Sequence, residues 1–179
     1  THSQTPDAVF AHFPGLKVVA PGTPEDAKGL LKSAIRSDDP ILFIEHATLY
    51  QTRGEVPEGD YTVPIGKSKI QRPGKDVTIV ALSYMVMEAI EAAEKLARLG
   101  IEADVIDLRT LRPLDQTLIL ESVRKTGRLI VADTGWALAG MSAEIIATAS
   151  EGAFGSLKTA PRRICLPDCP TPTSPSQAA

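Results

Sequence analysis

The sequence has few of the residues that mark a disulfide-rich, membrane-spanning or nucleic-acid-binding protein. Among 179 residues there are 2 cysteines. These residues, Cys165 and Cys169, have neither the spacing of a usual zinc pair nor a histidine nearby, so we interpret them as free thiols in a reducing compartment. A net charge of -3 gives no reason to expect a nucleic-acid partner. No apolar run reaches membrane-spanning length and no signal peptide opens the chain, so we expect no membrane partner.

The motifs of several common enzyme classes are also missing. There is no serine nucleophile elbow. The segment Gly135 to Gly140 lacks the spacing of a dinucleotide-binding fingerprint, and Gly66-Lys67-Ser68 lacks the upstream glycine of a phosphate loop. These absences argue against a flavodoxin-like or other nucleotide-binding protein. The residues by themselves therefore predict a scaffold and no complete active site.

What the sequence does contain is the composition of a globular domain. Hydrophobic residues make up 43% of the chain and charged residues 23%. These proportions are typical of a protein with a packed core rather than of a disordered chain. The chain opens at Thr1 without an initiator methionine, which predicts a cleaved or truncated product.

Strand and helix patterns alternate along the chain. A clear helix start is Thr23 as N-cap, followed by Pro24 at the first helical position. Glycines predict the ends of two other helices, at Gly100 and Gly127. Apolar runs predict strands at 17–20, 41–44, 77–82, 103–108, 129–132 and 163–166. Helical spacing predicts helices from 24 to before 38, and at 86–99, 115–125 and 143–150.

This alternation predicts an α/β fold. We expect mostly parallel twisted sheets with helices on both faces, arranged as two successive three-layer units. The Pro- and Gly-rich stretch 51–75 is interpreted as a connection between them, with short strands near 61–65 and 67–71. From about residue 167 the chain is rich in Pro, Ser and Thr, which predicts an extended tail.

Several long strings of residues resemble one family. They are His2-Ser3-Gln4-Thr5-Pro6-Asp7, His12 to Pro21, Glu25 to Arg36, Asp76 to Val80, Val105 to Asp115 and Gly140 to Ile145. In these strings the chain is similar to the β subunits of 2-oxo acid dehydrogenases of the pyruvate, branched-chain or acetoin type. Those subunits belong to the thiamine-diphosphate-dependent, decarboxylating component of the complex. The resemblance extends to about Pro170.

The resemblance implies a domain organisation and a cofactor. Residues 1–50 would be the later half of a pyrimidine-binding domain, 51–75 a linker, and 76–179 a transketolase-type C-terminal domain. Thiamine diphosphate would lie between an α and a β subunit, with magnesium held mainly by the α subunit. The family's glutamate that acts on the aminopyrimidine ring lies upstream of His2. We therefore expect no cofactor-binding residue within this chain.

The resemblance also implies site residues. His2 matches the histidine of the family's His-Ser-Gln motif, which faces the active-site channel, so its implied role is orientation or proton transfer. Some relatives bind potassium through backbone carbonyls after the corresponding helix. Here that implies a potassium site at Ala34, Ile35, Ser37 and Asp39. The family often has Asp-Asn-Asn where this chain has Ser37-Asp38-Asp39, so an added charge alters the field there.

The implied activity is oxidative decarboxylation of a 2-oxo acid with acyl transfer to the lipoyl-lysine of an acyltransferase core, in an α2β2 assembly with an α subunit. A bacterial cytoplasm or a mitochondrial matrix would suit it. Because the chain lacks both ends of a full subunit, we expect it to be inactive by itself. The alternatives are a non-catalytic dimerisation or docking module, and a sister thiamine enzyme such as acetoin dehydrogenase or transketolase.

Overall fold

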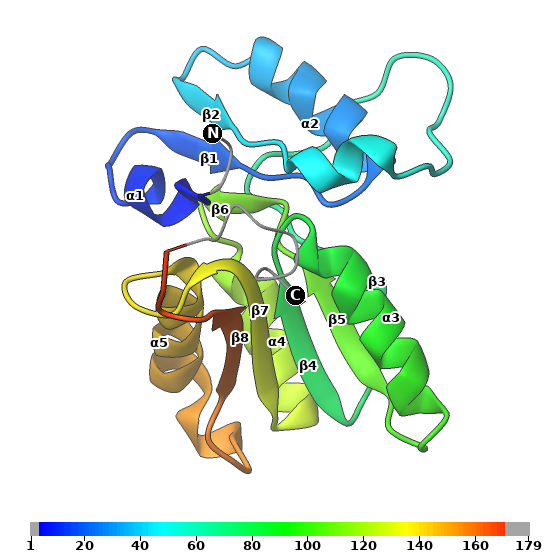
Figure 1. Ribbon diagram of the computed structural model, residues 1–179, viewed down its shortest axis with the longest axis vertical. Coiled ribbons are helices and arrows are strands. Elements are labelled where there is room, and N and C mark those ends of the chain that lie inside the picture. The colour runs from blue at the N-terminus through cyan, green and yellow to red at the C-terminus, as the bar shows by residue number, and fades with distance from the viewer. Residues whose placement is uncertain (1–3, 171–179) are drawn as a thin grey trace.

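The computed structural model describes residues 4–170, which form two sheets joined end to end (Figure 1). The first unit, residues 4–51, contains α1 (Asp7–Ala11), β1 (Lys17–Val19), α2 (Pro24–Ile35), β2 (Ile41–Phe43) and the 3-10 helix η1 (Ala47–Gln51). The second unit, residues 69–170, contains β3 (Lys69–Arg72), β4 (Val77–Ala81), α3 (Met85–Ala97), β5 (Ala103–Asp107), β6 (Thr110–Arg112), α4 (Gln116–Thr126), β7 (Leu129–Trp136), α5 (Met141–Ala153), the 3-10 helix η2 (Phe154–Ser156) and β8 (Arg162–Leu166).

The second unit is built on a five-stranded sheet in the order β3-β5-β4-β7-β8. β4 pairs in parallel with both β5 and β7, and β8 extends the parallel set at one edge. β3 is antiparallel to β5 and forms the other edge. Every residue of β4 and of β5 is buried, as expected of central parallel strands that carry helices on both faces.

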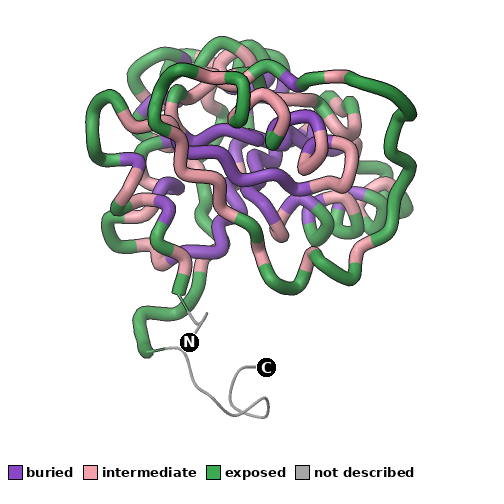
Figure 2. Tube along the Cα trace, turned by 90° about the horizontal axis from the view of Figure 1, so that it is seen from above, coloured by how far each residue is buried: buried purple, intermediate pink, exposed green. Residues whose placement is uncertain are grey.

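Helices cover both faces of this sheet and form two cores. Alternate residues of β4, Val77 and Ile79, pack with Val86 and Ala93 of α3 on one face. Val80 points to the opposite face, into a core that α4 and α5 complete. Figure 2 shows the buried strands running through the middle of the molecule between more exposed helices and loops. The second unit is therefore a three-layer α/β sandwich.

The first unit is built on a smaller sheet of three strands in the order β2-β1-β6. β1 and β2 are parallel, whereas β6 is antiparallel to β1 and comes from the second unit. Val19, Leu30 and Val63 form a small core on α2's side of this sheet. The second unit thus supplies a strand of the first sheet, and we did not predict that strand.

The predicted α/β class is confirmed, and so are the main signals for where helices begin and end. The Thr23 side chain accepts a hydrogen bond from the backbone N–H of Asp26, and Pro24 opens α2. Gly127 ends α4 in a left-handed conformation, φ 73°. Some local predictions were wrong. No strand forms at 61–65 among the described residues, α5 begins at Met141, and β7 continues to Trp136. The boundaries 1–50, 51–75 and 76–179 stay predictions.

No helix within residues 4–170 has the length and apolar character needed to cross a bilayer.

Candidate functional site at the junction of the two units

The carboxyl ends of β4, β5 and β7 point toward the first unit (Figure 1). Hydrogen bonds between described residues join the units at this edge, and three of them are as follows. The backbone N–H of Ala20 donates to the carbonyl of Arg109 at 2.9 Å, and the guanidinium of Arg112 donates to the carbonyl of Ala11 at 2.9 Å. The Thr5 hydroxyl donates to the carbonyl of Thr134 at 3.2 Å. In open α/β sheets this edge is where functional groups usually gather, so we take this junction as the candidate site.

Strained backbone is concentrated at the same edge. Ser83 follows β4, Arg109 follows β5, and Ala139 follows β7, and all three are non-glycine residues with positive φ, at 47°, 59° and 54°. Such conformations cost free energy and persist only where surrounding contacts hold them. Gly22 shows how close the units come, since a Cβ there would lie 2.8 Å from the Val86 side chain.

A buried ionic cluster, which we call the brace, links α2 to the β5–β6 turn. The guanidinium of Arg109 lies 2.5 Å from a carboxylate oxygen of Asp26, and the side chains are 10% and 0% exposed. The other Asp26 oxygen accepts the Thr23 hydroxyl at 2.9 Å. Burying a carboxylate is costly unless a partner neutralises it, so Arg109 is required once Asp26 is inside.

The brace contains a second carboxyl group, Asp107. It accepts the backbone N–H of Arg109 at 2.9 Å and the side-chain amide of Gln71 at 3.2 Å. Burial and, to a smaller extent, the charge of Asp26 together raise the pKa of Asp107 to about 7. The Arg109 guanidinium pairs with Asp26, whereas Asp107 is bonded, among the described residues, only by the backbone N–H of Arg109 and by Gln71. A proton on Asp107 near neutral pH follows from its raised pKa.

A second buried acidic residue lies within β7. Asp133 is 2% exposed and accepts the backbone N–H groups of Gly135 at 2.8 Å and Ser142 at 3.0 Å. The second of these bonds satisfies a free N–H group in the first turn of α5, a role that Gly140 at the N-cap position lacks a side chain to fill. Asp133 therefore links the end of β7 to the first turn of α5.

Asp7, the first residue of α1, is also buried. Its side chain is 4% exposed, and a carboxylate oxygen accepts the backbone N–H of Ala8 at 2.7 Å. Burial and the charge of Asp133 raise the pKa of Asp7 to about 6. Two buried carboxyl groups from the two units thus interact across the junction.

Two cavities flank the junction. A groove of about 640 Å³ is lined by α1, by the β6–α4 connection and by the start of α5, with Arg112, His12 and Glu144 among its polar residues. A smaller pocket of about 130 Å³ lies at the start of α2 and includes His46 and Tyr50.

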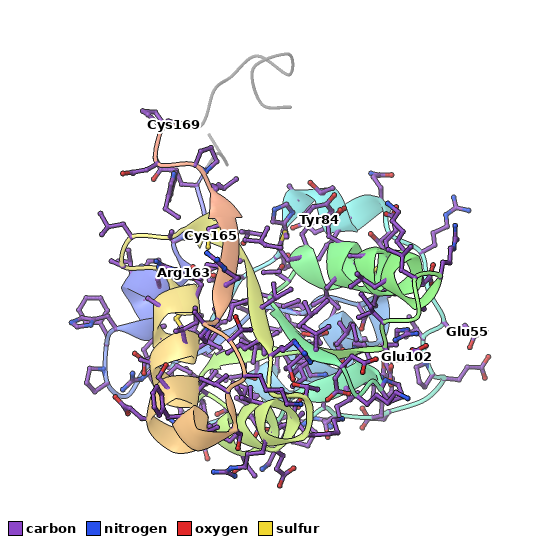
Figure 3. All side chains as sticks on the ribbon, turned by 90° about the horizontal axis from the view of Figure 1, so that it is seen from below. Glu55, Tyr84, Glu102, Arg163, Cys165 and Cys169 are labelled. Atoms are coloured by element: carbon purple, nitrogen blue, oxygen red, sulfur yellow. The ribbon has the colours of Figure 1, made fainter. Side chains whose placement is uncertain are left out.

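His46 is held on the second unit by an aromatic contact. Its ring stacks on Tyr84 with centroids 5.1 Å apart, and Figure 3 shows Tyr84 beside η1. Its Nδ1 accepts the backbone N–H of Thr48 at 3.3 Å, which assigns the proton of the neutral ring to Nε2. Burial lowers the pKa of His46.

The structure describes the predicted potassium-site residues but not the predicted catalytic residue. His2 lies outside the described residues, so its catalytic role stays a prediction. Ala34 and Ile35 end α2, and Ser37 and Asp39 lie in the loop that follows. The structure does not bring this loop to the junction hydrogen bonds described above, because it lies at the opposite end of α2 from Thr23.

The proposed potassium loop already holds a cation of the chain. The ammonium of Lys17 lies 2.6 Å from a carboxylate oxygen of Asp39 and 3.5 Å from the Ser37 hydroxyl. The carbonyl of Ala34 accepts the backbone N–H of Ser37. These contacts engage side chains and one backbone carbonyl, so the potassium site at Ala34, Ile35, Ser37 and Asp39 stays a prediction. Among residues 4–170 no cluster of three His, Cys, Asp or Glu side chains could hold a metal ion.

The two cysteines are free thiols, as predicted. Figure 3 places Cys165 on β8 and Cys169 farther along the chain. The thiol of Cys165 lies 3.3 Å from the Ser142 hydroxyl, at the start of α5.

Comparison with protein families shows the family to which the chain belongs. A family model described as "Transketolase, C-terminal domain" matches residues 66–179. The chain belongs to this family. A second model, described as "Transketolase, pyrimidine binding domain", matches residues 1–53. The transketolase-type C-terminal domain therefore corresponds to the five-stranded second unit, with part of a pyrimidine-binding domain before it.

Curated relatives of this transketolase-type chain are β subunits. The β subunit of acetoin:2,6-dichlorophenolindophenol oxidoreductase from Cupriavidus necator is 51% identical over 175 residues, which are 98% of this chain and 52% of that relative. The mitochondrial β subunit of the pyruvate dehydrogenase E1 component from Dictyostelium discoideum is 47% identical, with 96% and 49% covered. The 2-oxoisovalerate dehydrogenase β subunit from Bacillus subtilis is 44% identical, with 94% and 52% covered.

Solved structures agree with this assignment. The protein titled "Split gene transketolase, inactive beta4 tetramer" superposes with a TM-score of 0.77 at 28% identity, over 92% of this chain and 52% of that one. The chain spans about half the length of the curated relatives it matches.

Sequence reasoning missed the residues that form this transketolase-type junction. Asp26, Asp107 and Arg109 were noted only as parts of resembling strings. Asp7 and Asp133 were given no role. One signal was available, since Asp107 and Asp133 both interrupt or end apolar strand runs, where a carboxyl group needs a specific partner.

Proposed function

We propose that the chain is the later part of the β subunit of a thiamine-diphosphate-dependent 2-oxo acid dehydrogenase. The whole subunit would act in oxidative decarboxylation of a 2-oxo acid and in transfer of the acyl group to lipoyl-lysine of an acyltransferase core. One observation carries the proposal. Three β subunits with three different named substrates match 94% to 98% of this chain. The architecture they share with it therefore suits one reaction class and leaves the substrate open.

His2 is the residue of this chain that we propose as catalytic. An imidazole with its usual pKa exchanges protons near neutral pH, which suits orientation or proton transfer during decarboxylation and acyl transfer. The position of Thr5 supports this role, because its hydrogen bond to Thr134 fixes the chain three residues after His2 on the carboxyl edge of the second sheet.

Thiamine diphosphate, when bound, supplies the carbanion nucleophile and the electron sink for decarboxylation. We expect the part of the site that would hold its aminopyrimidine ring to lie outside the described residues. The carboxylate of Glu25 is paired with Lys69 at 2.8 Å, and that of Glu45 accepts the Tyr50 hydroxyl at 2.8 Å. The glutamate that the family uses would therefore come from sequence upstream of His2, and we assign no cofactor contact to this chain.

An α subunit is the partner that the proposal requires. It would complete the cofactor site in an α2β2 assembly and hold most of the magnesium contacts. The names of the similar proteins include a mitochondrial form, and others come from bacteria. We propose a bacterial cytoplasm or a mitochondrial matrix as the location.

Acetoin is a second candidate substrate. The relative that is 51% identical is named for acetoin, while those named for pyruvate and 2-oxoisovalerate are 47% and 44% identical. Differences this small favour acetoin weakly, and an assay must decide between the three.

The test uses the whole β subunit together with its α chain. The natural upstream sequence is restored, both chains are co-expressed, and thiamine-diphosphate-dependent dye reduction is measured with pyruvate, branched-chain 2-oxo acids and acetoin. The His2→Ala variant and the His12→Ala variant are assayed in parallel, because His12 is an exposed histidine ten residues away.

Activity on one substrate, with a loss of at least about a hundredfold in His2→Ala and little change in His12→Ala, would support both the class and the residue. An α chain that does not copurify, together with no activity on any of these compounds, would remove the dehydrogenase assignment. A docking module or a single-chain sister enzyme would then be the remaining assignments.

A further inference from the structure

One buried carboxylate lies away from the junction, near the amino end of β5. It belongs to Asp104, whose side chain is 0% exposed. Its oxygens accept hydrogen bonds from the backbone N–H of Gly74 at 3.0 Å and from the hydroxyl of Ser122. The one ion pair that it forms among the described residues is with the ammonium of Lys125, at 2.7 Å. Burying a carboxylate is costly unless it is paired, so this single amine offsets the charge of Asp104.

A network of hydroxyl groups connects this ion pair to the rest of the second sheet. The hydroxyl of Thr78 lies 2.7 Å from the hydroxyls of both Ser122 and Thr126, and all three side chains are buried. The helix α4 contributes Ser122, Lys125 and Thr126, and the paired strands β4 and β5 contribute Thr78 and Asp104. The ammonium of Lys125 is therefore the outermost member of a polar network that joins α4 to two strands.

Lys125 differs from the other lysines that form ion pairs within residues 4–170. Their carboxylate partners have side chains between 38% and 63% exposed, and these partners are Glu25, Asp39, Asp60 and Glu91. Water solvates such a carboxylate when its lysine is neutralised. Water does not reach Asp104, whereas the side chain of Lys125 is 44% exposed. A chemical change to the accessible amine of Lys125 therefore leaves a buried charge with neither a cation nor solvent.

The contact with Asp104 also suits Lys125 to covalent modification. A lysine ammonium becomes a nucleophile only after it loses a proton, and the Asp104 carboxylate is a base within hydrogen-bond reach of it. Attack of the free amine on the carbonyl carbon of an acyl thioester forms the C–N bond of an amide and breaks the C–S bond. Of the three protons on the ammonium, one stays on the amide nitrogen, one moves to Asp104 and one leaves with the thiol.

We propose that Lys125 is a site of acylation by acyl thioesters, and that this modification loosens α4 from the second sheet. The neutral amide no longer offsets a charge on Asp104, so the carboxyl group either keeps the proton or is ionised without a cation. In both states the ion pair between α4 and β5 is lost.

The modification site itself does not rest on the proposed function. Its regulatory meaning does, because the acyl group carried on lipoyl-lysine is itself an acyl thioester. The product of the proposed reaction would then be a reagent that modifies the subunit that helped to form it.

The first measurement locates the modification. The whole β subunit, assembled with its α chain, is incubated with acetyl-coenzyme A, and the acetylated fraction of each lysine is followed over time by peptide mass spectrometry. We expect acetylation of Lys125 to be at least about tenfold faster than that of Lys75, an exposed lysine that forms no ion pair among the described residues. In Asp104→Asn, which lacks the base, the two lysines should react at similar rates.

The second measurement follows the effect on the fold. Lys125→Gln removes the charge as acylation does, and should lower the melting temperature of the assembled protein by at least about 5 °C. Lys125→Arg keeps a cation, and Lys95→Gln breaks an exposed pair, so both should melt within about 2 °C of the unmodified protein. Protein acetylated at Lys125 should melt like Lys125→Gln.

A double variant shows whether the buried charge is the cause. Asp104→Asn removes the carboxylate that Lys125 neutralises, so adding Lys125→Gln to it should change the melting temperature little. This comparison also holds if Lys125→Gln alone is too unstable to purify, because the double variant no longer contains a buried unpaired charge.

Each outcome decides one claim. Acetylation of Lys125 that is no faster than that of Lys75, or that stays faster in Asp104→Asn, would overturn the modification site. Acetylation of Lys125 without a change in melting temperature, or a loss in Lys125→Gln that persists in the Asp104→Asn background, would overturn its effect on α4. If the assembled protein acts on none of the substrates, the proposed function and the link to its product fail, and the acetylation and melting data still decide the site.

Discussion

Two buried carboxyl groups near the junction, Asp26 and Asp7, are neutralised in different ways. In the brace, Asp26 is neutralised by Arg109, a cation at every pH at which the protein is folded. At the start of the chain, Asp7 and Asp133 have no such cation among the described residues, so a proton is what can neutralise Asp7. A guanidinium makes a permanent joint, whereas a proton makes a joint that depends on the solution. The pairing of Asp26 with Arg109 should therefore persist across the pH range, whereas the charge on Asp7 changes with pH.

The largest effect expected from this comparison follows removal of the permanent cation. Arg109→Ala leaves the Asp26 carboxylate buried and unpaired, and should lower the free energy of unfolding by about 3–5 kcal/mol. Ala and Arg share the same difficulty at φ 59°, so backbone strain does not change. Urea denaturation measures the loss. The control is Arg36→Ala, whose exposed pair with Asp60 should contribute little, and a loss near that of the control would mean that the brace is not a joint.

Asp107 should produce the next largest effect, through pH. Its pKa is raised to about 7 in the folded protein, so its contribution to stability is complete below its unfolded value near 3.8 and is lost as the pH rises through 7. The shift corresponds to at most about 4 kcal/mol. Asp107→Asn should match the unmodified protein at pH 4 and exceed it at pH 8. Denaturation at both pH values tests this, and equal pH dependence in the two proteins would show that Asp107 is ionised throughout.

Asp7 should contribute in the same direction but over a lower range. Its stabilising contribution is complete below about pH 4 and is lost as the pH rises through about 6. The expected size is at most about 3 kcal/mol. Denaturation curves of Asp7→Asn between pH 4 and pH 8 should lack the part of the decline that lies below pH 6. If that part persists in the variant, another group must be its source.

The smallest effect concerns the loop that follows α2. Lys17→Met removes a partly exposed ion pair and should cost less than about 1 kcal/mol. If Lys17 occupies the place of a monovalent cation, melting temperatures in KCl and NaCl of equal ionic strength should agree for the unmodified chain. A potassium-specific rise should appear, if at all, in the variant. A rise in the unmodified chain would support the potassium site at Ala34, Ile35, Ser37 and Asp39.

Local signals predicted the second unit well because its elements obey local rules. Apolar runs gave the buried strands, helical spacing gave α3 and α4, and Gly127 ended a helix where a left-handed residue was needed. The first unit was harder, because β6 lies far along the chain and joins the first sheet only through tertiary pairing with β1. A strand as short as β6 shows no hydrophobic periodicity, so its pairing with β1 could not be predicted from the sequence.

The candidate site was hardest of all to predict. Asp7 and Asp133 are 126 positions apart, and each looks unremarkable in its own segment. Their importance comes from their burial and from the effect of the Asp133 charge on the pKa of Asp7. Both depend on how the first unit packs on the second. The role of His2 was inferred mainly from resemblance to a family motif, and it stays a prediction because His2 lies outside the described residues.

The pairing of β6 with β1 of the first sheet affects the cooperativity of unfolding. β1 pairs with a strand that follows directly after β5 of the larger sheet, so the two sheets are coupled through the β5–β6 connection. Unfolding of the larger sheet in turn withdraws the partner of β1. The two sheets should therefore behave as one cooperative transition, and a chain cut in the connection near residue 60 should yield halves that fold together on mixing but not apart.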